Sequence, residues 1–494
     1  MSALNNSKSP SFASNVLTLV TGTTIAQIIT ILASPIITRL YGPEAFGLVA
    51  LFMSITSIIG VISCFRYELA IMLPETDEEA ANVFGLCMII VVLISVASIP
   101  VVFLIQEPLI VFLKAPQLGS FFWLIPPTLL FSGTFLGLNY WNTRTKHFHR
   151  LSVARVVSAC ATTGTQLGFG FAGLATSGVL IWANVLGHIV STLTLGIQIL
   201  KYHVSFFREN ISREGIKQAL QRYSNFPKYD IWSALLNSIS WQIPIFLLAS
   251  FFSTTVVGYY SLGMMVIQFP MSFIGGAIAQ VFYQRAAEAK NSGVLRPLVE
   301  DIFKILVILG LFPMIVLLLI GKDLFTVVFG SQWAISGIYV EILSIWAFVW
   351  FISSPLSTIV SVLEKQSWGL FLNLLIFSTR VISLVIGGIL GDVVIALLLF
   401  SASGIIVYGY LCIKTMEYSG ISIRNILKMI LEKSSRVIPV GIILLLLVLL
   451  KITSIIIVIV ACLSALIYYS YLIKDEPLLY DQFARMFIRH KKGN

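Results

Sequence analysis

The chain has 494 residues, of which 57% are hydrophobic and only 11% are charged, and its formal net charge is +10. Soluble domains carry about 25% charged residues, so this composition excludes a water-soluble globular fold and favours a protein whose solvent is lipid. In such a protein, net positive charge reports the cytoplasmic loops and not nucleic-acid binding. The five cysteines lie within or beside apolar runs without disulfide or metal spacing, so we expect them to be small apolar fillers.

Membrane-spanning helices are the first expectation. A span needs about 20 mostly apolar residues to cross about 30 Å of hydrocarbon. Fourteen segments are candidates: 15–38, 46–65, 82–105, 119–140, 151–173, 178–200, 229–250, 256–281, 302–320, 336–362, 368–390, 393–413, 437–450 and 452–473. The first should remain as a span, because the N-terminus lacks the features of a cleaved signal peptide. The ninth and thirteenth are the shortest.

Brief turns join these spans. The first turn is "RLYGPEA" at 39–45, where Gly42 and Pro43 break the helix. Nearly all lysines and arginines fall in alternate loops, which the positive-inside rule assigns to the cytoplasm together with both termini. Three segments on that side, 211–223, 423–431 and the tail near 479–487, have one apolar and one basic face. Such helices rest on anionic lipid; docking of a partner enzyme is the alternative.

The chain also carries a weak internal repeat. Residues 33–55 and 242–267 each have a proline inside a span, a short turn and then a glycine-aromatic start to the next span, with Gly47 and Gly258 at corresponding places. This repeat predicts two lobes of six spans each in the same orientation, followed by a final pair of spans. The expected divisions are an N-terminal lobe at 1–200, a linker with an interfacial helix at 201–228, a C-terminal lobe at 229–413, an interfacial helix at 414–436, the last two spans at 437–473 and a tail at 474–494.

Two stretches carry a family resemblance. "RLYGPEAFG" at 39–47 and "FRYELAIMLPETDEEA" at 65–80, within a 6+6+2 arrangement of spans, resemble bacterial polysaccharide flippases. These are oligosaccharide-lipid exporters of the superfamily that includes multidrug exporters and lipid II flippases. The resemblance implies an all-α membrane protein with two pseudo-symmetric lobes around a central cavity. It also implies alternating-access transport of undecaprenyl-pyrophosphate-linked repeat units to the outer leaflet of the bacterial cytoplasmic membrane, for O-antigen or another surface polysaccharide.

Charged residues inside spans are candidate binding groups, because burying charge in lipid is costly. Arg380 is the clearest, since it lies midway along the eleventh span and its guanidinium can hold a phosphate bidentately. A structural interhelical pair or a side chain that snorkels to the interface is the alternative. Arg39, Arg66 and Arg285 lie at the ends of spans one, two and eight, where anchoring at the interface competes with the cavity role that the resemblance implies. For ion coupling the candidates are Glu68, Asp230 and Glu341.

Amide and aromatic side chains suit sugar hydroxyls and sugar rings. Asn237 and Trp241 share one face of the seventh span with Gln242 beside them, and Gln27 lies in the first span. Asn184 and His188 lie in the sixth span. For each of these residues, hydrogen bonding between helices is an alternative to substrate contact.

The sequence indicates no catalytic chemistry and no cofactor. The chain lacks a phosphate-binding Gly-rich loop ending in Lys-Ser/Thr, and His147 and His149 have no third metal ligand nearby. Three functions remain open: a lipid-linked oligosaccharide flippase, a cation-coupled multidrug exporter of the same superfamily, and a membrane-embedded polymerase or glycosyltransferase. Mid-span arginine with few mid-span acids favours the first. Its expected partners are the lipid-linked sugar, membrane lipids, and polysaccharide polymerase with chain-length machinery, but no nucleic acid.

Overall fold

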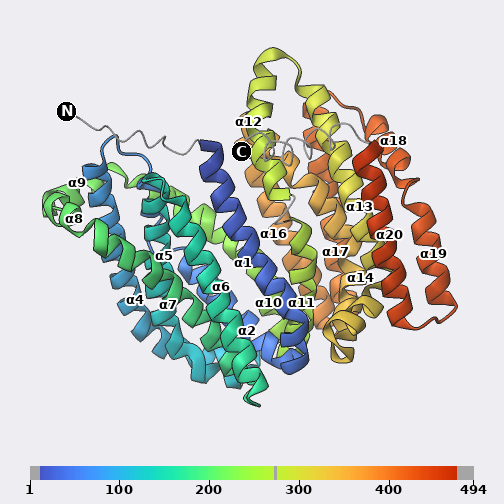
Figure 1. Ribbon diagram of the computed structural model, residues 1–494, viewed down its shortest axis with the longest axis horizontal. Coiled ribbons are helices and arrows are strands. Elements are labelled where there is room, and N and C mark those ends of the chain that lie inside the picture. Colours follow the sequence, from blue (N-terminus) through green and yellow to red (C-terminus); the bar gives the residue numbers. More distant parts are fainter. Residues whose placement is uncertain (1–11, 272–274, 476–494) are drawn as a thin grey trace, which may run out of the picture. The chain divides into compact units, whose positions relative to one another are not determined.

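The computed structural model describes residues 12–271 and 275–475, and every regular element in those two ranges is a helix (Figure 1). The longer helices are α1 (Phe12–Leu40), α2 (Pro43–Gly60), α4 (Asp77–Leu113), α5 (Ile125–Arg144), α6 (Phe148–Phe171), α7 (Ser177–Tyr202), α10 (Ile231–Phe251), α11 (Thr254–Pro270), α12 (Gly276–Ser292), α13 (Leu295–Phe329), α14 (Ala334–Ser353), α16 (Gln366–Ile389), α17 (Val393–Tyr418), α19 (Ile438–Leu449) and α20 (Ser454–Asp475). Short helical segments lie between them: α3 (Tyr67–Ala70), η1 (Pro116–Leu124), α8 (Val204–Asn210), α9 (Arg213–Arg222), η2 (Phe226–Asp230), η4 (Ser331–Trp333), η5 (Pro355–Ser357), α15 (Thr358–Val362) and α18 (Ile423–Ser434).

The predicted all-helical membrane class is confirmed. Eleven helices in the described ranges are long and apolar enough to cross a bilayer. The predicted fourteen spans include three segments outside this set: α6, α19, which has only 12 residues, and the eighth span. The eighth was expected as one helix over 256–281, but α11 ends at Pro270 and α12 begins at Gly276.

The ninth span is longer than expected. The sequence predicted its end at residue 320, where the apolar run meets Gly321 and Lys322. Instead, α13 kinks at Ile320 (φ −130°, ψ 20°) and continues to Phe329. The backbone N–H of Lys322, just after the kink, donates to the Glu341 carboxylate of α14 at 2.7 Å. Glu341, a candidate for ion coupling, thus binds a backbone group that the kink exposes.

The chain divides into two compact units. The first comprises Met1–Ser261 with Gly388–Val393, and the second comprises Leu262–Gly387 with Val394–Asn494. The first unit therefore extends past the linker expected at 201–228 and includes α10. Within it, α6 packs against both α1 and α7, while α5 contacts α4 and α7 and α2 contacts α7 and α10.

In the second unit, α13 is the central helix. It packs against α14, α18, α19 and α20. Phe312 of α13 stacks on Tyr468 of α20 with ring centroids 5.2 Å apart, and the Tyr468 hydroxyl donates to the Ile308 carbonyl at 2.9 Å. The final helix pair is therefore fixed to the second unit through α13.

The two glycines of the predicted repeat meet in the first unit. A β-carbon added to Gly47 of α2 would clash with the Thr254 carbonyl oxygen, and one added to Gly258 of α11 would clash with the Pro43 carbonyl oxygen. Each carbonyl lies four residues before the opposite glycine. The contact is thus reciprocal, as a two-fold relation between corresponding segments requires, and the backbones approach this closely because neither residue has a side chain.

Both amphipathic segments expected at 211–223 and 423–431 contain helices, α9 and α18. A serine caps each one: the Ser212 hydroxyl accepts the N–H of Gly215, and the Ser422 hydroxyl accepts that of Asn425. α18 packs on α13 and leaves three apolar side chains exposed on another face, Ile423, Leu427 and Leu431. The third amphipathic segment, in the tail, lies outside the described residues.

Candidate functional site

Three predicted site residues come together in one charge cluster of the first unit: Arg66, Glu68 and Asp230. The Arg66 Nε lies 2.7 Å from Asp230 Oδ2, and its Nη1 lies 3.4 Å from Glu68 Oε1. Arg66 directly precedes α3, and Asp230 ends η2 at the start of α10. The arginine therefore joins the connection between α2 and α4 to the beginning of α10.

An unusual backbone directs Arg66 into this cluster. Phe65 and Arg66 have positive φ angles of 49° and 66°. A left-handed conformation costs a non-glycine residue roughly 1–2 kcal/mol, so the surrounding contacts must offset two such residues in a row. One of these contacts is the Tyr67 hydroxyl, which donates to the Leu220 carbonyl of α9 at 3.1 Å.

Glu68 is the most buried member of the cluster. Its side chain is 2% exposed, against 27% for Arg66 and 42% for Asp230. Its Oε2 atom is buried and has no hydrogen-bond partner within the described part of the chain. Burial raises the pKa of Glu68, while its own backbone N–H and Arg66 act in the opposite direction and Asp230 adds to the rise. The Glu68 carboxyl therefore keeps its proton to a higher pH than an exposed glutamate, and its role in ion coupling stays a prediction.

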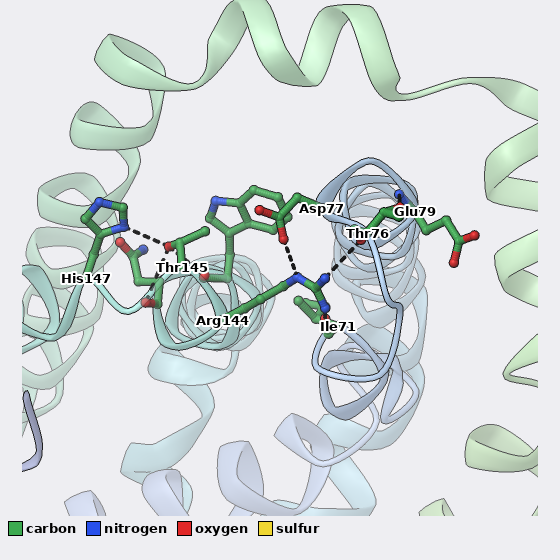
Figure 2. A network of polar contacts seen from close by, with 9 residues as sticks. Ile71, Thr76, Asp77, Glu79, Arg144, Thr145 and His147 are labelled. Carbon is green, nitrogen blue, oxygen red and sulfur yellow. Dashed lines mark hydrogen bonds and ion pairs between the residues drawn. The ribbon is translucent and has the colours of Figure 1, made fainter. Parts of the chain in front are cut away.

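A second polar network holds the segment that leads into α4 (Figure 2). The Arg144 guanidinium of α5 pairs with Asp77 Oδ1 at 2.8 Å and donates to the carbonyl oxygens of Ile71 and Thr76 at 3.0 and 2.9 Å. The Thr76 hydroxyl caps α4 by accepting the N–H of Glu79. No sequence pattern distinguishes Arg144, because contacts with backbone carbonyls leave none.

Arg380 has a different environment in the second unit. It lies on α16, is 4% exposed, and its Nη2 donates to the Tyr408 hydroxyl of α17 at 3.0 Å. The Phe400 ring, also on α17, lies 6.0 Å from the guanidinium carbon. This geometry matches the structural alternative stated above, an interhelical contact; a phosphate-binding role for Arg380 stays a prediction.

The remaining predicted residues lie on α1, α10 and α12. Arg39 is exposed at the end of α1 and donates to the Pro35 carbonyl at 3.1 Å. Asn237 is exposed on α10, while Trp241 one turn later and Gln27 on α1 are half-buried. Arg285 is exposed on α12. A contact between these residues and the substrate stays a prediction.

One arginine inside a predicted span was not among the candidate binding residues. Arg155, on α6, is half-buried and donates to the Thr23 hydroxyl of α1. The signal was present, since a cation within the 151–173 segment meets the same criterion that selected Arg380.

A cavity of about 310 Å³ with a mainly apolar surface and several hydroxyl groups lies among α2, α5 and α7 of the first unit. Its lining residues are Met53, Thr56, Ser57, Gly60, Ser63, Thr128, Ser132, Phe135, Leu136 and His188. Ser57 accepts a hydrogen bond from Gln242 Nε2 of α10 at 3.4 Å. The sequence pointed to His188 and Gln242, but not to the hydroxyls, because serine and threonine are ordinary in membrane helices. In the described ranges, no group of three or more His, Cys, Asp and Glu could hold a metal ion.

The chain belongs to a family described as "Polysaccharide biosynthesis protein", whose profile matches residues 36–338, more than half of the sequence. Its fold is similar to that of the lipid II flippase MurJ in an inward closed conformation, with a TM-score of 0.70 and 12% identity over 92% of this chain and 99% of the other. It is also similar to an inward-facing multidrug resistance MATE family transporter of the MOP superfamily, with a TM-score of 0.62 and 17% identity over 82% and 95%. No curated protein matches the chain. The chain is thus a multi-pass membrane protein with a transporter fold.

Proposed function

We propose that this protein is a flippase that moves undecaprenyl-pyrophosphate-linked oligosaccharide repeat units from the inner to the outer leaflet of the bacterial cytoplasmic membrane by alternating access. The observation that carries the proposal is the match of residues 36–338 to a polysaccharide biosynthesis family, on a fold similar to a lipid II flippase. The distribution of lysine and arginine supports a cytoplasmic position for both termini. The products pass to a polysaccharide polymerase and its chain-length machinery.

The multidrug exporter is the alternative with structural support, because the fold is also similar to a MATE transporter. A cavity for lipophilic cations would favour acidic lining residues. The lining of the cavity among α2, α5 and α7 contains neither aspartate nor glutamate among its described residues, and no lysine or arginine either, so its charge does not distinguish the two functions. The match to a polysaccharide biosynthesis family favours the flippase. A polymerase or glycosyltransferase has less support, since the similar solved structures are transporters.

A reconstituted assay tests the proposal. Purified full-length protein in liposomes should make the sugar of an undecaprenyl-pyrophosphate oligosaccharide accessible to a membrane-impermeant lectin, whereas protein-free liposomes should not. Ethidium uptake into the same vesicles provides the comparison. Ethidium transport without sugar exposure would favour the exporter and contradict the flippase.

A further inference from the structure

The cavity among α2, α5 and α7 has the size of a ligand site. Its volume of about 310 Å³ lies at the lower end of the range of about 300–1,000 Å³ for small-molecule pockets. It is also about ten times the liquid volume of one water, ~30 Å³. A single dehydrated ion would leave most of this space unfilled, so a small organic group fits it better.

Hydrogen-bond acceptors dominate the polar part of the lining. The Thr128 hydroxyl donates to the Leu124 carbonyl at 2.6 Å, Thr56 donates to Phe52 at 3.0 Å, and Ser63 donates to Gly60 at 2.7 Å. A hydroxyl has one proton and two acceptor lone pairs. These three side chains are buried. The hydroxyls that a ligand can reach are those of Ser132, which is half-buried and donates to the Leu129 carbonyl at 3.4 Å, and Ser57, which is exposed. Their oxygens keep acceptor lone pairs for a ligand that carries O–H or N–H donors.

The rest of the lining is apolar or neutral. Phe135 and Leu136 of α5 and Met53 of α2 supply an apolar surface. Within the described residues, the lining contains no aspartate, glutamate, lysine or arginine. A pyrophosphate would find no lysine or arginine here, only the imidazole of His188, and a lipophilic cation would find no carboxylate. A neutral ring with several hydroxyl donors and an apolar C–H face is complementary to both parts of the lining.

The rim of the cavity adds a polar anchor. Ser57 is exposed, and Gln242 of α10 bonds both Ser57 through Nε2 and Ser54 through Oε1, the latter at 2.9 Å. These groups lie on helices apolar enough to span a bilayer. Polar groups at membrane depth face protein interiors or water-filled cavities and mark substrate pathways.

We propose that this cavity binds one uncharged pyranose ring of the transported head group. The inference rests on the proposed function, because it assigns the sugar, and not the pyrophosphate, to the first unit. The hydroxyls of Ser57 and Ser132 accept hydrogen bonds from the sugar, and Phe135 packs against its apolar face.

Direct binding tests the cavity without transport. Saturation-transfer difference NMR with neutral methyl pyranosides should show contact with full-length protein in nanodiscs. The double variant Ser57→Ala with Ser132→Ala should weaken binding about tenfold, since two neutral hydrogen bonds contribute about 1.4 kcal/mol together. Thr194→Val is the matched control: its hydroxyl also donates within its own helix, to Val190 at 2.7 Å, but it does not line the cavity. Ser132→Ala alone serves if the double variant fails to fold.

Transport with the same proteins separates the two proposals. Wild-type protein should flip a glycosylated carrier in preference to sugar-free undecaprenyl pyrophosphate, and the double variant should lose this preference about tenfold. Flipping with no saturation transfer, or with equal transfer in the double variant, would overturn the cavity assignment and leave the flippase standing. Saturation transfer that the double variant loses, without any flipping, would overturn the flippase and leave a carbohydrate site.

Discussion

Arg66 and Arg380 were predicted to do the same work, and the structure gives them different surroundings. Arg66 is 27% exposed and lies between two carboxylates, at the connection of α2 to α4. Arg380 is 4% exposed and donates to a neutral tyrosine between α16 and α17. Arg380 was the clearer candidate for substrate binding because it lies midway along a span. At that depth, however, a hydrogen bond to a neighbouring helix also contributes more to stability. The arginine with carboxylate partners is the one in the connection between α2 and α4.

Removing Arg66 should produce the largest effect. Arg66→Ala leaves Glu68 buried without its counter-charge, and breaking such a pair costs about 3–5 kcal/mol, at the lower end here because Arg66 is partly exposed. The apparent melting temperature in detergent should fall sharply. The double variant Arg66→Ala with Glu68→Gln should recover most of this loss; no recovery would show that the two residues act independently.

Arg380→Met keeps an apolar stem of similar length and removes the hydrogen bond to Tyr408, so it should cost about 1–3 kcal/mol because the charge and its bond are lost together. Tyr408→Phe removes only the acceptor and should cost about 1 kcal/mol. Melting temperature and flipping are measured for both. A structural Arg380 predicts that flipping survives in both folded variants, whereas loss of flipping in Arg380→Met alone would give Arg380 a substrate role.

A pH-dependent difference should distinguish Glu68 from the other members of the cluster. Burial raises its pKa, so the folded protein holds this proton more tightly than the unfolded chain, and the associated stability is lost as pH rises through the raised value. Glu68→Gln remains neutral at every pH. Its melting temperature relative to wild type should therefore be higher at about pH 8 than at about pH 4.5. An equal offset at both values would contradict the raised pKa.

Asp230→Asn should have the smallest effect. Asp230 is 42% exposed, and a partly exposed ion pair contributes about 0–1 kcal/mol. The amide can still accept from Arg66 Nε. Melting curves at low and high salt measure this contribution. A fall in melting temperature larger than that of Arg380→Met would contradict the small contribution expected of Asp230.

Some residues of these polar clusters could be selected from the sequence, whereas their partners could not. Arg66, Glu68 and Asp230 were each selected because charge near apolar spans is costly, but Asp230 is 162 positions from Glu68, and no sequence pattern joins them. The hydroxyls of Thr128 and Ser132 gave no signal, because each satisfies its own helix. Arg144 gave none either, since its partners are mainly backbone carbonyls.

The sequence alone determined the class of the protein. Long apolar runs, short turns and basic loops require a bundle of membrane helices, since lipid allows few other ways to satisfy the backbone. Tertiary structure decided which polar groups meet: the carboxylates around Arg66, Tyr408 beside Arg380, and the hydroxyls that line one cavity. The apolar pattern specifies where a helix lies in the bilayer, whereas the partner of a polar side chain depends on packing between helices far apart in the chain.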